Sequence, residues 1–262
     1  MWQKPILKTI FLLNVDNYAP EITKLTYPFI EAYAKKIGAK IFMIGNREFP
    51  DFPPVYEKLQ IYKLAQEIGS DWNIYIDSDA LIHPDMPDVT TMLSKDTVLH
   101  NGTDFAPIRW KYDRFFIRDG RHIGSCNWFT IASDQCIELW KPLDDLTKEE
   151  AISNIFPILD ELHTVITPDH LIDDYTLSRN IAKYGLKATT FIELLRKHGL
   201  EGGEFMWHAY QMPVAKKVEE MKKIIAIWRK TPAEREADVA KLAEKQKASE
   251  LETLREILKK VP

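Results

Sequence analysis

The sequence predicts an α/β fold, with a mixed, mainly parallel sheet flanked by helices and a helical C-terminal extension. The first observation behind this is that three apolar, β-forming segments alternate with two segments of helical periodicity. Such an order predicts a parallel sheet with right-handed crossovers. The second is that 262 residues, 45% of them hydrophobic, suffice for one large domain with an appendage. We assign residues 1–217 to the domain and 218–262 to the charged extension.

The first strand, helix and second strand follow one another closely. Residues 8–15 form a largely apolar run bounded by polar residues, which is typical of a strand buried in a parallel sheet. A helix is predicted from Pro20 up to Gly38, because proline suits the first helical turn and glycine commonly ends a helix. Apolar residues recur between them at three- and four-residue spacing, which indicates an amphipathic helix. The second strand, 40–44, comes directly after Gly38.

The remaining elements are predicted from the same patterns. A second amphipathic helix runs from Val55 to Gly69, and residues 72–76 form a third buried strand. The proline-containing, aromatic and charged segment 83–120 has no clear periodicity and is interpreted as a loop or lid. Further strands are predicted at 128–132 and 189–192, and further helices at 134–140, 148–162 and 169–184.

The C-terminal extension has a clear helix start. Thr231 provides an N-cap, Pro232 a proline at the first helical position and Glu234 the capping-box carboxylate. A helix is therefore predicted to begin near Pro232. Its apolar positions are interrupted in the middle, which favours a packed helix, or one that contacts a partner or a second copy, over a long coiled coil.

Composition excludes several classes of protein. A net charge of -4 and a pI near 6.0 argue against a dedicated nucleic-acid binder, which normally presents a strongly basic face. Two cysteines, Cys126 and Cys136, give no disulfide framework, and we expect both to be reduced and packed. The apolar run 9–15 is too short for a signal-peptide core or a membrane span, which predicts a cytoplasmic protein.

The most informative residues are two carboxylates at the end of the third strand. Asp77 and Asp79 are two residues apart and come directly after a buried strand. Open parallel sheets bind ligands at the carboxyl ends of their strands, and a hard cation there bridges one or two carboxylates to nucleotide phosphates. The alternative is that both residues cap a turn, as aspartate often does.

The context of this pair resembles a known group of enzymes. The segment 56–64 (YEKLQIYKL), then 72–79 (WNIYIDSD), resembles GT-A glycosyltransferases, and the glycogenin-like group in particular. The resemblance implies a GT-A, Rossmann-like fold and Asp77 and Asp79 as ligands of Mn²⁺ or Mg²⁺. It also implies that Asp77, Ser78 and Lys58 contact the nucleotide-sugar donor. Lys58 is otherwise an ordinary solvated helix lysine.

Three further segments match the same group. Leu12, Asn14, Asp16 and Tyr18 resemble the loop that receives the base and ribose, where Tyr18 offers a stacking face and Asn14 a hydrogen bond to a base edge. The late His208 resembles the histidine that completes the metal site. Imidazole favours Mn²⁺ over Mg²⁺.

The third segment, 173–178 (DDYTLS), resembles the part of these enzymes near the transferred sugar. It makes Asp173 and Asp174 the candidate catalytic residues. Consecutive helical residues point about 100° apart, so we expect one carboxylate to face the cleft. Asp173 shares a helix face with polar residues and Asp174 with apolar ones, which favours Asp173.

The sequence also departs from the group. Gln211 and Val214 stand where the glycogenin-like enzymes have the glycine and lysine that follow the late histidine. The cation that contacts the diphosphate is therefore open between Lys58, Lys216 and Lys217. The glycogenin-like resemblance implies a retaining reaction, whereas the sequence alone does not choose between a retaining and an inverting one.

The function that follows is a metal-dependent glycosyltransferase. It would move a sugar from a nucleoside diphosphate donor, with a UDP-sugar preferred, to a hydroxyl group on a glycan, protein or small molecule. One alternative is a nucleotidyltransferase acting on sugar phosphates, although residues 14–20 lack the glycine-rich phosphate loop that it needs. Another is a carbohydrate- or nucleotide-binding protein without turnover.

Overall fold

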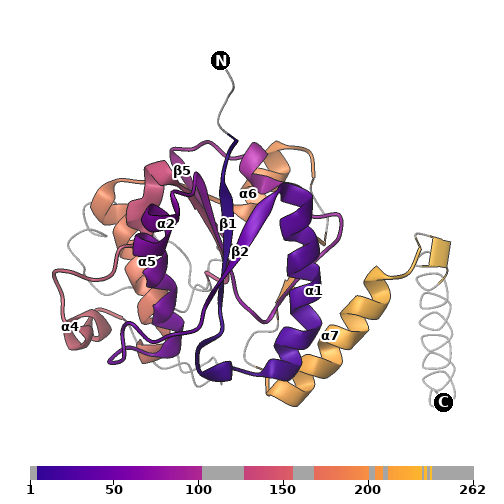
Figure 1. Ribbon diagram of the computed structural model, residues 1–262, viewed down its shortest axis with the longest axis horizontal. Helices are drawn as coiled ribbons and strands as arrows, with labels where there is room; N and C mark the ends of the chain where they lie inside the picture. The colour runs from indigo at the N-terminus through magenta and orange to yellow at the C-terminus, as the bar shows by residue number, and fades with distance from the viewer. Residues whose placement is uncertain are drawn as a thin grey trace, which may run out of the picture. The chain divides into compact units, whose positions relative to one another are not determined.

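The chain forms two compact units in its computed structural model, Met1–Met212 and Pro213–Pro262. The structure describes residues 5–101, 127–155, 168–200, 204–208, 212–231, 233–234 and 237. Within the first unit, helices lie on both faces of a central sheet (Figure 1). The predicted α/β architecture is therefore confirmed.

The main sheet of the described residues has six strands in the order β2-β1-β3-β6-β5-β7. β6 runs antiparallel to both of its neighbours, and the other pairings are parallel. The sheet is thus mixed and mainly parallel, as predicted. Its strands are β1 (Lys8–Leu13), β2 (Ala39–Ile44), β3 (Trp72–Ile76), β5 (Thr97–His100), β6 (Phe129–Ser133) and β7 (Lys187–Thr190).

Successive side chains of a strand point to opposite faces of the sheet, so the core has one part on each face. Phe11 and Tyr75, which are paired neighbours in β1 and β3, point to one face. Ile10 and Ile74, one residue earlier, belong to the core on the other face. Because all of these side chains are fully buried, both faces must be covered, which explains why the strands are continuously apolar.

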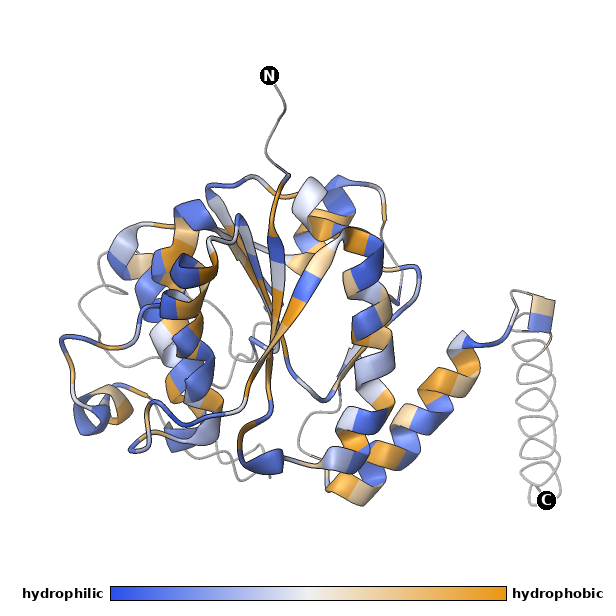
Figure 2. Ribbon diagram, viewed as in Figure 1, coloured by the Kyte–Doolittle hydropathy of each residue, from blue (hydrophilic) through white to orange (hydrophobic). Residues whose placement is uncertain are grey.

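Each face has its own helices. α1 (Pro20–Ile37) and α6 (Phe191–Lys197) cover one face (Figure 1). The helices carry both hydrophobic and hydrophilic residues, as expected for elements with one buried side (Figure 2). The other face is covered by α2 (Ile61–Ile68), α4 (Lys148–Ser153), α5 (Ile172–Tyr184) and the 3-10 segments η2 (Pro54–Gln60) and η4 (Asp134–Trp140).

Helix α1 shows how local sequence sets an element's limits. Pro20 occupies its first turn, and Lys35 and Lys36 lie in its last turn, where positive charge complements the helix dipole. Gly38 ends the helix in the left-handed conformation, with φ of 69°, which glycine adopts without strain. The predicted start and end are both confirmed.

Two short strands form a separate antiparallel sheet. β4 (Ala80–Ile82) follows β3 after a tight turn, and β8 (Met206–His208) pairs with it from far along the chain. Short 3-10 turns occur elsewhere in the first unit, at η1 (Val15–Asn17), η3 (Val89–Thr91) and η5 (Pro168–Leu171).

Some predicted elements differ from the observed ones. The strand predicted at 189–192 is wrong in its second half, because Thr190 and Glu193 form a capping box that starts α6 at Phe191. The helix predicted at 148–162 ends at Ser153, and residues 156–167 lie outside the described part. β5 lies within the segment interpreted as a loop or lid, of which 102–126 is not described.

The second unit contains α7 (Val214–Trp228), which the sequence analysis did not identify as a separate helix. The predicted capping box after it is present. The backbone N–H of Glu234 donates to Thr231 Oγ1 at 3.3 Å, and the backbone N–H of Thr231 donates to Glu234 Oε2 at 2.7 Å. The rest of the predicted C-terminal helix lies mostly outside the described residues.

Two smaller expectations concern cysteine and the membrane. Cys136 is a buried free thiol, and Cys126 lies outside the described residues. In the described part of the chain, every helix is too short or too polar to cross a bilayer.

The last residue of β5, His100, is a buried titratable group in the fold. Its Nδ1 has no hydrogen-bond partner among the described residues. Burial lowers the pKa of His100 to about 4, and the nearby Glu193 carboxylate opposes this only in part. The folded protein therefore holds a neutral imidazole that the unfolded chain would protonate below its ordinary pKa, near 6.5.

We predict that His100 destabilises the fold as the pH falls. Between about pH 6.5 and 4 the unfolded state binds the additional proton, so the free energy of unfolding decreases with falling pH. From pH 7 to pH 5 the loss from this residue is about 2 kcal/mol. In urea unfolding across this range, the free energy of unfolding of His100→Gln should decrease less with falling pH than that of the parent chain. His198→Gln changes an exposed histidine and should behave like the parent chain.

Candidate metal centre

The turn between β3 and β4 carries the two carboxylates predicted to bind a metal. Asp77 directly follows Ile76, the last residue of β3, and Asp79 directly precedes Ala80, the first residue of β4. The backbone N–H of Ala80 donates to the Asp77 carbonyl at 3.0 Å, which closes the turn.

Neighbouring elements hold this turn from two sides. The Thr26 hydroxyl in α1 donates to the Ser78 carbonyl at 2.6 Å. The backbone N–H of Asp77 donates to the carbonyl of Trp128 at 2.8 Å, just before β6. These hydrogen bonds pair buried backbone groups of the turn, and they hold the backbone of both aspartates in place.

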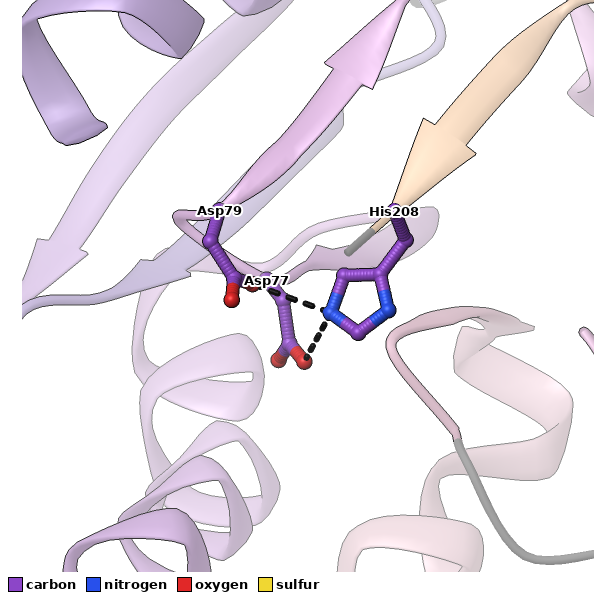
Figure 3. A group of neighbouring side chains, drawn as sticks. All are labelled: Asp77, Asp79 and His208. Carbon is purple, nitrogen blue, oxygen red and sulfur yellow. Dashed lines mark hydrogen bonds and ion pairs between the residues drawn. The ribbon is translucent and has the colours of Figure 1, made fainter. Parts of the chain in front are cut away.

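Strand β8 brings the predicted histidine to these aspartates. His208 is paired across the small sheet with Ala80, the residue that follows Asp79. His208 Nε2 is 3.0 Å from Asp79 Oδ1 and 3.7 Å from Asp77 Oδ2 (Figure 3). One ligand atom from each residue lies within 4.8 Å of the other two.

This donor set fits a divalent ion. Around an octahedral ion with bonds of about 2.1 Å, neighbouring ligand atoms are about 3.0 Å apart and opposite ones about 4.2 Å. The observed separations of 3.0 and 3.7 Å from His208 Nε2 to the two carboxylates fall within that range. Two carboxylates and one imidazole suit Mn²⁺ better than Mg²⁺, which prefers oxygen alone.

The ring of Trp128 fixes the orientation of the histidine. It stacks on the His208 imidazole, with ring centroids 4.9 Å apart and an angle of 12° between the planes. Trp128 thus contacts two of the three residues: its carbonyl accepts a hydrogen bond from the Asp77 backbone, and its ring stacks on His208. Trp128 was not predicted as a site residue, because its only signal in the sequence is its place at the start of a predicted strand.

A buried ion pair lies close to the candidate metal-binding group, which consists of Asp77, Asp79 and His208. Lys58 Nζ is 2.7 Å from Asp173 Oδ2, and the two side chains are 4% and 5% exposed. Burial lowers the pKa of Lys58, but the carboxylates of Asp173 and Asp77 outweigh it, so its pKa lies above the ordinary value. The alternative of a solvated Lys58 is wrong, because η2 turns this residue toward the sheet.

The two candidate catalytic carboxylates have different partners. Asp173 contacts Lys58, whereas Asp174 Oδ1 accepts hydrogen bonds from the backbone N–H and the side-chain amide of Asn127, at 3.0 and 2.9 Å. Both carboxylates lie in the first turn of α5 and both are buried. The helix face of Asp174 predicts apolar surroundings, whereas its observed contacts with Asn127 are polar.

The loop after β1 holds the residues predicted to contact the nucleotide. The side chain of Leu12 lies in the core, whereas Tyr18 is 48% exposed. Asn14 Oδ1 is buried without a hydrogen-bond partner among the described residues. Asp16 lies in the left-handed region, with φ of 57°, which is uncommon for residues other than glycine.

Arg47 and Glu57 form a partly buried contact that the sequence did not predict. The Arg47 Nε donates to Glu57 Oε1 at 2.9 Å, and an Arg47 terminal nitrogen lies 3.8 Å from Asp16 Oδ2. This arginine therefore connects the loop after β1 to the segment that carries Lys58. Lys216 and Lys217, the other cations considered for the diphosphate, lie in α7 of the second unit.

Comparisons with known proteins give structural similarities only. No protein-family model and no curated protein matches the sequence. One similar solved structure is a glycosyltransferase involved in glycosylation of the major capsid of PBCV-1, at 10% identity over 84% of this chain and 100% of that one, with a TM-score of 0.48. Another is a Drosophila beta-1,4-galactosyltransferase 7 mutant in complex with manganese, UDP-Gal and xylobiose, at 14% identity over 79% and 72%, with a TM-score of 0.42.

The Lys58–Asp173 pair allows a stability prediction. Removing one partner of a buried ion pair leaves an uncompensated charge, which costs about 3 kcal/mol or more. We expect Lys58→Met to lower the free energy of unfolding by this amount in a urea titration. The double variant Lys58→Met with Asp173→Asn should recover part of the loss, and a purely additive loss would contradict the pairing.

Proposed function

We propose that this chain is a metal-dependent glycosyltransferase that moves a sugar from a nucleoside diphosphate donor to a hydroxyl group of an acceptor. The observation that carries the proposal is the convergence of Asp77, Asp79 and His208 at the carboxyl end of β3. Ligand sites in open α/β sheets occupy this edge. A UDP-sugar is the first donor to test, and a glycan or another hydroxyl compound the acceptor.

The metal-binding group would be held by three described elements. Asp77 comes from the end of β3, Asp79 from the start of β4 and His208 from the end of β8. When bound, Mn²⁺ or Mg²⁺ would neutralise the charge that develops on the departing nucleoside diphosphate. The chain itself contributes fixed ligand positions, because backbone hydrogen bonds and the Trp128 ring hold the residues in place.

The donor's nucleoside would lie in the loop after β1. The register pairs Leu12 with Ile76, so Asn14 and Asp77 leave the sheet at the same edge on adjacent strands. The buried side-chain oxygen of Asn14, which has no hydrogen-bond partner in the described part of the chain, suits an N–H group of the base, and the exposed Tyr18 ring suits stacking. Asp16 lies in the same loop, and Ser78 in the turn of the metal ligands.

Asp173 would act at the reacting sugar. Its carboxylate is in direct contact with Lys58, whose ammonium also interacts electrostatically with Asp77. Asp173 is therefore adjacent to the metal-binding group and carries a compensated negative charge. This charge can stabilise a cationic sugar or accept a proton from the acceptor, according to whether the reaction retains or inverts configuration. Asp174 is instead engaged with Asn127.

The direct test is release of nucleoside diphosphate from a donor. The full chain is incubated with UDP-, GDP- and dTDP-sugars, each with and without Mn²⁺, and both thermal stability and diphosphate release are measured. A ligand at about 100 times its Kd raises stability by about 2.7 kcal/mol. Metal-dependent release supports transfer chemistry, whereas stabilisation without any release would identify a binding protein.

Asp79→Ala is predicted to remove metal-dependent turnover. Because one of three protein ligands is lost, we expect donor hydrolysis with Mn²⁺ to fall by about 100-fold or more, roughly 2.7 kcal/mol in the barrier. Circular dichroism should show an unchanged fold. The matched control is Asp85→Ala, since this carboxylate is exposed just after β4. Normal turnover in Asp79→Ala would make the metal assignment wrong.

Asp173→Asn and Asp174→Asn are predicted to have different effects. Loss of the Asp173 charge should lower kcat by about tenfold or more, roughly 1.4 kcal/mol, with the donor KM little changed. Asp174→Asn should mainly lower the Tm, since a neutral amide oxygen accepts the two Asn127 hydrogen bonds more weakly than a carboxylate oxygen does. Asp173→Asn should also lower the Tm, because buried Lys58 loses its charged partner. Steady-state kinetics therefore distinguish the roles, and a greater kcat loss in Asp174→Asn would reverse them.

A further inference from the structure

Tyr75 lies between the metal-binding group and the Lys58–Asp173 pair. It is in β3, two residues before Asp77, and its ring points to the face of the sheet that η2 and α5 cover. The Tyr75 hydroxyl donates a hydrogen bond to Asp77 Oδ1. Lys58 Nζ lies over the same ring, 4.5 Å from its centroid.

The Tyr75 hydroxyl leaves the two oxygens of Asp77 with different surroundings. Oδ1 accepts from Tyr75, whereas Oδ2 faces His208 at 3.7 Å from Nε2. A carboxylate on a turn would otherwise rotate between several rotamers. The hydroxyl therefore selects the orientation in which Oδ2 is presented to the other two ligands.

The Tyr75 ring has little freedom to move. Only 1% of the residue is exposed, and its ring contacts that of Trp140, with centroids 6.1 Å apart. Lys58 covers the ring and is itself held by Asp173 at 2.7 Å. A hydroxyl group carried on so constrained a ring can act as a rigid support for Asp77.

We infer that Tyr75 is a positioning residue for the metal site: it fixes the Asp77 carboxylate in the orientation that binds the ion. The inference rests on the proposed function, since it assumes that Asp77, Asp79 and His208 bind a divalent cation. Groups that hydrogen-bond to metal ligands commonly contribute 10- to 100-fold to metal affinity. Tyr75 belongs to this class by its contact, although it does not reach the ion itself.

The test compares Tyr75→Phe with a matched control. Tyr33→Phe removes an equally buried hydroxyl, which donates to the Pro87 carbonyl at 3.1 Å from α1 on the other face of the sheet. Mn²⁺ binding to the full-length chain is measured from the electron paramagnetic resonance signal of free Mn²⁺, with and without UDP. Thermal melts of the same samples report on folding.

We expect Tyr75→Phe to raise the Kd for Mn²⁺ by about tenfold or more, and Tyr33→Phe to leave it unchanged. Equal Mn²⁺ affinity in the parent chain and Tyr75→Phe would overturn the inference while leaving the metal site intact. Absence of Mn²⁺ binding to the parent chain under both conditions would overturn the metal site, and the inference with it. Equal affinity losses in both tyrosine variants would show a general effect of hydroxyl removal and contradict a specific role of Tyr75.

Discussion

The pairing of β4 with β8 is the contact that the proposed site depends on. Each strand has only three residues, yet their register sets His208 opposite Ala80 and therefore next to Asp79. A shift by one residue would turn the imidazole to the other side of the small sheet, because side chains alternate along a strand. The stack on Trp128 adds a second constraint on the same ring. The arrangement of the three proposed metal ligands thus rests on strand register as well as on residue type.

Negative charge is concentrated at this edge of the sheet, and the fold compensates it with specific partners. Asp173 is paired with buried Lys58, Asp174 accepts two hydrogen bonds from Asn127, and Asp77 accepts one from Tyr75. Burying a carboxylate without such partners is strongly unfavourable. The contacts that make the carboxylates tolerable in the folded state also fix their directions, so stability and a preorganised site have the same structural cause.

The sequence predicts most of the fold because its signals are local. Pro20 and Gly38 bound α1, and the apolar run 72–76 defines β3, without reference to the rest of the chain. β5 escaped prediction because four residues between irregular segments carry too little periodicity. The strand predicted through 192 failed because a capping box at Thr190 favours a helix start, a signal that was present in the sequence.

The site was predicted to a different extent at different residues. The chemistry of Asp77 and Asp79 follows from two carboxylates after a buried strand, and the assignment of His208 came from resemblance to a family. The contacts of Tyr75, Trp128 and Asn127 depend on which residues the tertiary fold brings together. Periodicity can assign Tyr75 to one face of a strand, but it cannot say that its hydroxyl reaches the next turn. Such supporting contacts are therefore accessible only from the structure.

The long sequence separation between Asp79 and His208 has a consequence for the order in which the protein matures. The two ligands are 129 residues apart, so a growing chain can complete β1, β2 and β3 well before β8 exists. At synthesis rates of about 5–20 residues per second, roughly 6–26 s pass between the two residues. During that interval the nascent sheet has its two carboxylates but lacks His208, the third proposed ligand. Products of premature termination before β8 would accordingly lack a complete ligand set, however well their first strands had folded.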